Sequence, residues 1–228
     1  PGDDFLTIVT MVTVALGLLR HLLTMRENQR LTQTLEEKID QLTAQIALFP
    51  DALLSQVLMA ATYPKDVAEA SAWARANPDE KGDAAVALVQ DRPWDPSVQS
   101  LVAFPQVAVM MGENPTWVKD LGDAFLLQPE DVMDSVQRLR LAAQNAGNLQ
   151  SNEQVVVKVE TQPPPDIVGQ VNAPPPPPQV IVIEQRSPEV IFVPMYNPVN
   201  VFGPWMWPAF PPVWIPPPPG FWWSWRSP

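Results

Sequence analysis

The side chains that could perform chemistry in this 228-residue chain are its carboxylates, because it has one histidine, His21, and no cysteine. This composition excludes histidine-based triads, histidine metal clusters, iron–sulfur clusters and thiol catalysis. Two acidic clusters remain, Asp79/Glu80/Asp83 and Glu130/Asp131/Asp134. Carboxylates at this spacing can transfer protons or bind a hard cation.

Both acidic clusters are predicted to lie in the first turns of helices, where the backbone dipole stabilises negative charge. That structural role accounts for the carboxylates without catalysis. The nine glycines form neither a phosphate-binding loop nor a G-x-S-x-G nucleophile elbow. We therefore expect a protein that is not an enzyme, with no cofactor and no metal site.

The nine tryptophans form two groups. Trp73, Trp94 and Trp117 stand near predicted helix ends or turns, where packing in the core is the expected role. The other six lie within residues 194–228, together with eleven of the 29 prolines and a single charged residue, Arg226. Proline keeps this segment out of helices and central strands, and exposed indoles are costly in water. The segment therefore needs a covering surface.

We expect residues 196–205 to pack on the chain's own domain and residues 206–228 to bind a partner. The predicted partner-binding residues are Trp207, Phe210, Trp214, Phe221, Trp222, Trp223 and Trp225. Three alternatives stay open: sugar binding by exposed tryptophans such as Trp205, Trp207 and Trp214, a membrane-interface position for the last three tryptophans, and plain disorder.

The N-terminal segment is apolar from Phe5 to Leu19 and, extended to Met25, reaches 21 residues, which is about 32 Å as a helix. A membrane anchor, a retained export signal and an apolar helix buried in a complex are the competing interpretations, and the anchor is favoured. Its predicted membrane-facing residues are Phe5, Ile8, Val9, Val12, Leu16 and Leu19. We expect membrane lipid to contact residues 5–25.

Residues 27–150 are predicted to form a helical domain, because prolines 50, 64, 78, 96, 115 and 129 follow possible N-caps and the apolar spacing between them is helical. Asn77-Pro78 with Glu80 has the form of a capping box. Leu31, Leu35, Ile39, Leu42 and Ile46 form a heptad-like seam that precedes these helices. A compact bundle of short helices is favoured over a helical repeat, since the intervening residues do not repeat.

Residues 151–204 contain β-branched runs at 155–160, 180–185 and 190–193, which predict short strands. The proline-rich linker between the first two runs is too long for a tight hairpin, so the two later strands are the expected local pair. The expected fold is therefore mainly α: residues 1–26 form a hydrophobic anchor helix, 27–150 a helical bundle, 151–204 a small β segment, and 205–228 an extended proline-rich tail.

Four stretches of this chain resemble a bacterial family known as domain of unknown function 3300: residues 46–64, 93–111, 121–140 and 190–205. The resemblance covers about residues 40–204. It implies an exported or envelope protein and supplies no catalytic residues. Some relatives look like lipoproteins, whereas this chain has no cysteine to carry a lipid.

These observations predict a non-catalytic accessory or scaffolding subunit that binds a larger membrane or envelope complex through its N-terminal helix and its tail. An envelope carbohydrate- or peptidoglycan-binding protein is the alternative. The net charge of -11 argues against nucleic acid as a partner. The resemblance favours a membrane-anchored protein with a periplasmic main domain, whereas Arg20, Arg26 and Arg30 after the apolar segment favour the opposite orientation.

Overall fold

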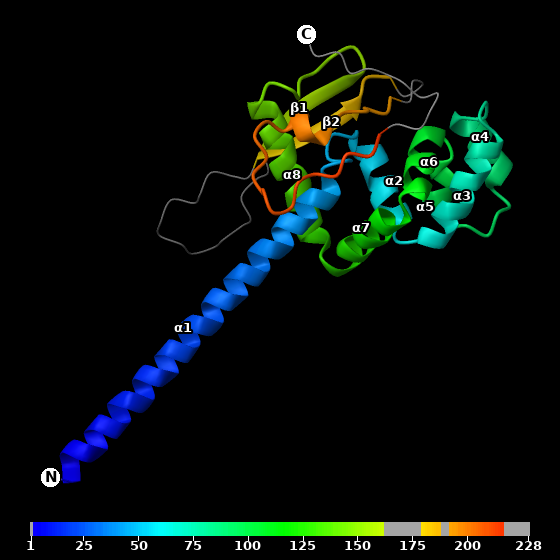
Figure 1. Ribbon diagram of the computed structural model, residues 1–228. Coiled ribbons are helices and arrows are strands. Elements are labelled where there is room, and N and C mark those ends of the chain that lie inside the picture. The colour runs from blue at the N-terminus through cyan, green and yellow to red at the C-terminus, as the bar shows by residue number, and fades with distance from the viewer. Residues whose placement is uncertain (1, 162–178, 188–191, 217–228) are drawn as a thin grey trace. The chain divides into compact units, whose positions relative to one another are not determined.

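The structure is a computed structural model, and it describes residues 2–161, 179–187 and 192–216 (Figure 1). For residues 2–10 and 12–14 the description covers the backbone alone. The chain divides into two compact units, residues 1–38 and residues 39–228. Its described part is mainly helical with one two-stranded sheet, which confirms the predicted fold class.

Helix α1 (Gly2–Thr43) supplies the first unit, and its last residues, from Ile39 onward, belong to the second. No proline interrupts these 42 residues. The predicted anchor residues Phe5, Ile8, Val9 and Val12 lie outside the described side chains, while Leu16 and Leu19 are exposed. In the described part of the chain, no helix combines the length and apolar character that crossing a bilayer requires.

Seven helices follow and form the helical body of the second unit (Figure 1). They are α2 (Asp51–Ala61), α3 (Pro64–Ala76), α4 (Gly82–Val89), α5 (Pro96–Leu101), α6 (Pro105–Glu113), α7 (Pro115–Leu127) and α8 (Pro129–Asn145). Five of the six predicted proline starts are confirmed, because proline occupies the N-cap of α2 and the first position of α3, α5, α7 and α8. Pro105 starts α6, which the sequence analysis did not predict.

The helix start predicted at Pro78 is wrong, since α4 begins four residues later at Gly82. Asn77 does not cap a following helix. It ends α3, where its side-chain amide donates to the carbonyl of Trp73 at 2.8 Å. Because Asn77 closes the preceding helix, Asp79 and Glu80 lie in the connecting turn, and only Asp83 of that acidic cluster is in a first helical turn.

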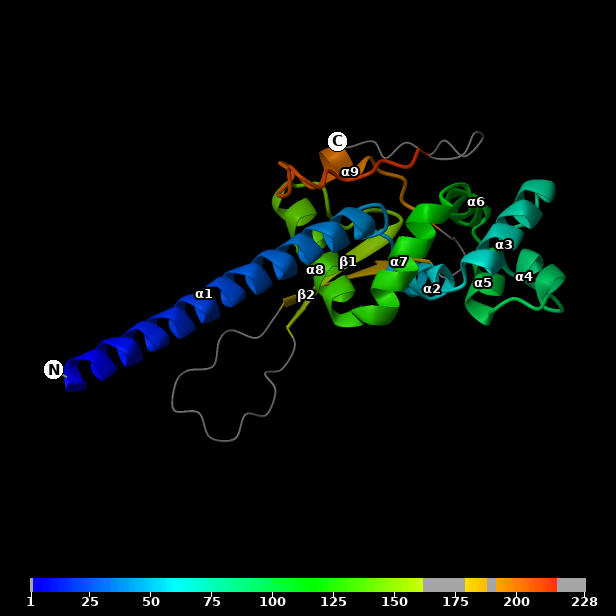
Figure 2. The ribbon, with the colours of Figure 1, turned by 60° about the horizontal axis from the view of Figure 1, so that its bottom comes forward.

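Two glycines allow helices of the body to approach closely. A side-chain carbon at Gly112 of α6 would clash with Ser71 of α3, and one at Gly122 of α7 would clash with the backbone of Ala61 at the end of α2. Figure 2 shows α3 beside α6, the most extensive helix–helix contact of the body. These approaches pack α6 against α3 and α7 against the end of α2.

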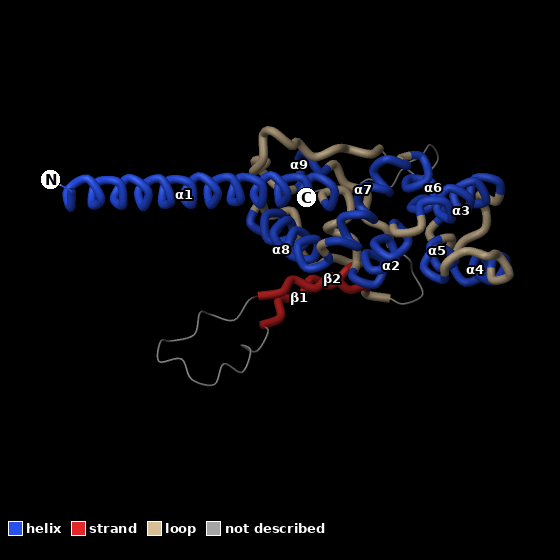
Figure 3. The backbone as a smooth tube through the Cα atoms, turned by 90° about the horizontal axis from the view of Figure 1, so that it is seen from below, coloured by secondary structure: helices blue, strands red, loops and turns tan. Residues whose placement is uncertain are grey.

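Strands β1 (Val155–Thr161) and β2 (Gln179–Gln185) pair antiparallel, with Val155 opposite Gln185. The expected partner of residues 180–185 was the run at 190–193. Residues 190 and 191 lie outside the described residues, 192 and 193 are not in a strand, and the observed partner is β1. Figure 3 shows the strands beside α8 and α2. Gln137 of α8 holds the outer edge of β2, because its side chain accepts from the amide of Ile181 at 2.8 Å and donates to the Ile181 carbonyl at 3.3 Å.

The buried Arg140 of α8 joins three parts of the second unit. Its guanidinium donates to the carbonyls of Ala47, Phe49 and Ile181 at 2.8, 3.0 and 2.7 Å and forms an ion pair with Asp51 at 2.6 Å. Burial lowers the pKa of Arg140, and Asp51 opposes this effect. The planar fork of arginine can reach three carbonyls at once, so one side chain fixes β2, the turn after α1 and the start of α2.

Candidate functional site

Residues 192–216, which we call the strap, contain little regular structure and pack against the rest of the second unit. Helix α9 (Pro198–Val201) is their one helix, and the Asn197 side chain caps it by accepting from the amide of Val199 at 2.9 Å. The strap contributes Val201, Phe202 and Ile215 to the apolar core. It is therefore part of the folded domain through Ile215, ten residues beyond the boundary expected at Trp205.

Tyr196 anchors the start of the strap. Its hydroxyl donates to the carbonyl of Ala44 at 2.9 Å and accepts from the amide of Leu48 at 3.2 Å. Burial raises the pKa of the Tyr196 phenol above its ordinary value. Its ring packs edge-on against Phe202, with ring centres 6.1 Å apart. The phenol is thus a structural link between the strap and the turn after α1.

Trp207 anchors the middle of the strap through Asp40, a fully buried carboxylate at the end of α1. The indole N–H of Trp207 donates to Asp40 Oδ2 at 2.7 Å, while Arg138 of α8 pairs with Asp40 Oδ1 at 2.8 Å. A buried carboxylate requires such partners on both oxygens. Asp40 consequently ties the strap to α8 as well as to α1.

Two glutamines hold the last part of the strap by its backbone. The side-chain amide of Gln41 donates to the carbonyl of Pro211 at 2.6 Å, and the amide of Ile215 donates to the side-chain oxygen of Gln45 at 3.1 Å. Residues 40–45 therefore form a receiving surface for the strap, all of it within the second unit (Figure 2).

The outward side of the strap carries apolar side chains between these attachment points. Met206 stands between Trp205 and Trp207, and Val213 and Trp214 stand just before Ile215. Met206, Val213 and Trp214 are 43%, 50% and 47% exposed. Their backbone is held on both sides, so these side chains are presented to solvent on a fixed support.

Among the predicted partner-binding residues, the structure separates three described positions. Trp207 and Phe210 are half-buried, and the carbonyl of Phe210 accepts from the indole N–H of Trp205 at 2.8 Å. Trp214 is exposed. Phe221, Trp222, Trp223 and Trp225 lie outside the described residues. The indole donors of Trp205 and Trp207 are both used within the chain, which leaves Trp214 as the described tail tryptophan open to a partner.

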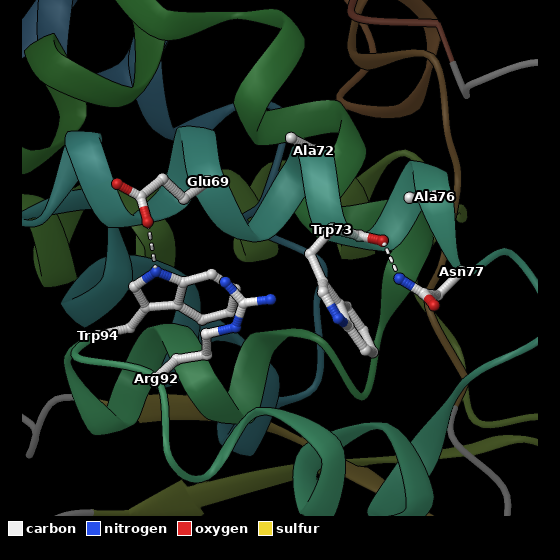
Figure 4. Close-up of a pocket in the computed structure, with 7 residues that line it drawn as sticks. All are labelled: Glu69, Ala72, Trp73, Ala76, Asn77, Arg92 and Trp94. Atoms are coloured by element: carbon white, nitrogen blue, oxygen red, sulfur yellow. Dashed lines mark hydrogen bonds between the residues drawn. The ribbon is translucent and has the colours of Figure 1, made fainter.

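A hollow of about 590 Å³ lies on the helical body between α3 and the turn before α5 (Figure 4). It is lined by Glu69, Ala72, Trp73, Ala76, Asn77, Arg92 and Trp94. The four α3 positions and the C-cap Asn77 follow helical spacing and so lie on one face. Trp94 is buried, its indole N–H donates to Glu69 Oε2 at 2.9 Å, and the Arg92 guanidinium covers its ring, 5.5 Å from the centre.

The carboxylates beside the hollow have structural partners. Asp95 caps α5, accepting from the amide and the hydroxyl of Ser97 at 2.9 and 2.6 Å, and its own amide donates to Asp66 at 3.0 Å. The Ser97 hydrogen bond lowers the pKa of Asp95, and the hydrogen bond to Asp95 raises the pKa of Tyr63. Asp95 therefore acts as the N-cap that its Asp-Pro sequence predicts.

Among the described residues, no group of three or more histidine, aspartate or glutamate side chains is placed to hold a metal ion. Glu130 and Asp131 lie in the first turn of α8, where negative charge favours the helix, as predicted. Trp117 donates to the carbonyl of Leu42 at 2.9 Å and packs on the core, also as predicted.

Asp40, Gln41 and Gln45, which receive the strap, were not predicted from the sequence, and Trp73 was expected to be a packing residue alone. One signal was present in the sequence: Asp40 and Gln45 are polar residues next to Ile39 and Ile46 of the predicted apolar seam, and both are buried. Arg140 carried a similar signal, because it lies four residues after Val136 on the apolar stripe of α8.

A family model described as "Protein of unknown function (DUF3300)" matches residues 35–226 of the chain. The chain is also 51% identical, over 198 residues, to a protein of Escherichia coli (strain K12) described as "Uncharacterized protein YacH". That match covers 80% of this chain and 32% of the relative, so the chain spans about a third of the relative's length. No solved structure matches.

Proposed function

Because the chain belongs to the DUF3300 family, whose function is unknown, we propose a role from its own surfaces: a non-catalytic accessory or scaffolding subunit of a larger membrane or envelope complex. Two apolar surfaces make the contacts. One is the outward side of the strap, and the other is the apolar segment of residues 5–25, which contacts membrane lipid. The main domain is placed on the periplasmic side, as expected from the family resemblance.

The single observation that carries this proposal is the exposure of Met206, Val213 and Trp214 on a backbone that is already fixed. An unstructured peptide must lose conformational freedom when it binds, whereas a segment held in place by its own domain has already lost it. Tryptophan and methionine are enriched in the cores of protein interfaces, and tryptophan is a frequent hot spot. The strap therefore combines suitable side chains with a low entropic cost of binding.

Exposed leucines in the first unit support the proposed contact with membrane lipid. In its described side chains, Leu16, Leu19, Leu22 and Leu23 are each more than half exposed on α1. A run of exposed leucines is unfavourable in water and marks a surface that is covered by a partner or by lipid. Residues 5–25 supply the lipid contact in this proposal.

The proposal is tested by isolating the full-length protein from its native membrane in mild detergent and identifying what remains bound by mass spectrometry. The triple variant Met206→Ala, Val213→Ala, Trp214→Ala is expected to lose those partners. Leu88→Ala is the control, because Leu88 of α4 is also an exposed apolar side chain, at 58%. Retention of the same partners by the triple variant would overturn the strap's role.

Side-chain variants are preferred to a truncation at residue 197 because of the core contacts of the strap. Removing residues 197–228 would take away Val201, Phe202 and Ile215, each of which is buried. Loss of binding by the truncated protein would then not distinguish unfolding of the domain from removal of the binding surface. The triple variant leaves the buried residues of the strap in place, and an unchanged thermal unfolding midpoint shows that the fold is intact.

A further inference from the structure

We propose that the hollow between α3 and the turn before α5 binds a proline-rich peptide, in the polyproline II conformation, supplied by a partner protein. This site is separate from the strap and does not depend on its role. The proposal rests on the unpartnered hydrogen-bonding groups of the lining, on the length of the hollow along α3 and on its apolar walls.

The free hydrogen-bonding groups that face the hollow include two strong donors. Within the described residues, neither the indole N–H of Trp73 nor the guanidinium of Arg92 has a hydrogen-bond partner, and the Trp73 nitrogen faces Arg92 across the hollow (Figure 4). Arg92 is held in position over the ring of Trp94. A ligand that enters here therefore meets two donors whose positions are set before it binds.

Two other polar side chains of the lining each use one polar atom within the chain. Glu69 Oε2 accepts from the indole N–H of Trp94, and the side-chain amide of Asn77 donates to the carbonyl of Trp73. The side-chain donors that have no partner among the described residues therefore include those of Trp73 and Arg92, and a ligand that presents acceptors to both suits the hollow. A run of prolines has this character, because each residue offers a carbonyl and lacks an N–H.

The length of the hollow matches a short polyproline helix. Its α3 face extends from Glu69 to Asn77, eight residues apart, which is about 12 Å at a rise of about 1.5 Å per residue. Four prolines in the polyproline II conformation span about 12 Å at about 3.1 Å per residue. The volume of about 590 Å³ also lies within the range of ordinary ligand pockets, which is roughly 300–1,000 Å³.

The walls supply the apolar contacts that such a peptide requires. Ala72 and Ala76 are small apolar residues of the lining, and the half-buried ring of Trp73 offers a face to the pyrrolidine rings. Aromatic-lined grooves bind proline-rich segments in this way, because the peptide is already extended and loses little entropy. The exposed charge of Arg92 complements the peptide carbonyls at the rim.

Titration of the full chain with synthetic decaproline, followed by calorimetry, tests the proposal, with a Gly-Ser peptide of equal length as the control. Trp73→Ala is expected to weaken decaproline binding at least tenfold, as for a buried aromatic hot spot. Trp73→Phe keeps most of the packing and removes the donor, so it is expected to weaken binding severalfold without affecting the fold. Arg92→Met should do the same, and Trp214→Ala should bind as the wild type does.

Three results would overturn the proposal. The first is equal affinity for decaproline and the Gly-Ser peptide, or unchanged decaproline binding in both Trp73 variants. The second is Trp73-dependent binding of a chitin oligosaccharide in place of decaproline, which would make the hollow a sugar site. The third is concentration-dependent self-association that Trp73→Phe abolishes while decaproline does not bind, which would make a second copy of this chain the occupant.

Discussion

The helical body and the strap are positioned by different kinds of contact. Each helix of the body begins at or beside a proline, with the exception of α4, and Asp95 caps its helix by bonding to a residue two positions away. The strap is held by Tyr196, Trp207 and Ile215, whose bonding partners lie 148, 167 and 170 positions earlier in the chain. Local patterns therefore place most of the helices, whereas the strap is placed by residues 40–45, which are far from it in the sequence.

The largest effect is expected at Arg140, because it joins the body to the turn that receives the strap. Arg140→Ala leaves the carbonyls of Ala47, Phe49 and Ile181 without their donor and opens a cavity. We expect a loss of roughly 3–5 kcal/mol in the free energy of unfolding, measured by urea denaturation. Both the body and the strap should lose protection from amide exchange.

Arg75 provides the control for this arginine. It pairs with Glu113 at 3.3 Å, and both side chains are about half exposed. Arg75→Ala should cost less than about 1 kcal/mol, as is usual for surface ion pairs. Comparable losses for the two arginine variants would show that Arg140 does not join the three segments.

A smaller effect, confined at first to the strap, is expected for Tyr196→Phe. The change removes the hydroxyl that links Ala44 and Leu48 and should cost about 1–3 kcal/mol, because two buried backbone groups lose their partner. Unfolding measurements of the variant and the wild type at pH 7 give this difference. Strap amides should lose protection before those of α6.

The same variant also tests a pH dependence. Burial raises the pKa of Tyr196 above its ordinary value of 10.0, so above pH 10 the unfolded chain releases a proton that the folded chain keeps. Stability is therefore fully present below that pH and declines as the pH rises above it. The wild type should lose more stability than Tyr196→Phe between pH 9 and pH 11, and identical declines would contradict a buried neutral phenol.

The smallest effect is expected for the local contact, Asp95→Ala. Loss of this N-cap should cost about 1 kcal/mol at pH 7 and leave the strap unchanged. The hydrogen bond from Ser97 lowers the pKa of Asp95, so the cap stabilises the protein above the ordinary aspartate pKa, and this contribution is lost as the pH falls through the lowered value. The difference between variant and wild type should shrink in acid, and a difference that persists at pH 2 would contradict the cap.

The same contrast between local and distant contacts explains which features of the fold could be predicted from the sequence. The Asp95-Pro96 cap, the stripe of α8 and the positions of β1 and β2 were predicted correctly because each signal lies within a few residues, whereas the pairing of the strands was not. The Asn77-Pro78 prediction failed because an asparagine can close one helix as readily as it opens the next, and here it bonds backwards to Trp73. The sequence alone does not say which of these two hydrogen bonds forms.

The candidate sites were less predictable than the helices. Trp207 was expected to face a partner, and what decides its role is Asp40, a carboxylate 167 positions away that is buried only in the folded unit. The hollow depends likewise on a contact between separate segments, the hydrogen bond from the indole N–H of Trp94 to Glu69, 25 positions earlier in the chain. No spacing rule links these residues, because their proximity results from packing.

The central claim, that the strap is fixed to its own domain through Ile215, is tested most directly by amide hydrogen exchange at Ile215. Its amide donates to the side chain of Gln45, so the account predicts strong protection in the wild type. It also predicts a marked loss of protection in Gln45→Ala, while the amide of Ala108 in α6, which donates to Phe104, stays unchanged. Exchange of the Ile215 amide at the unprotected rate in the wild type would contradict the account.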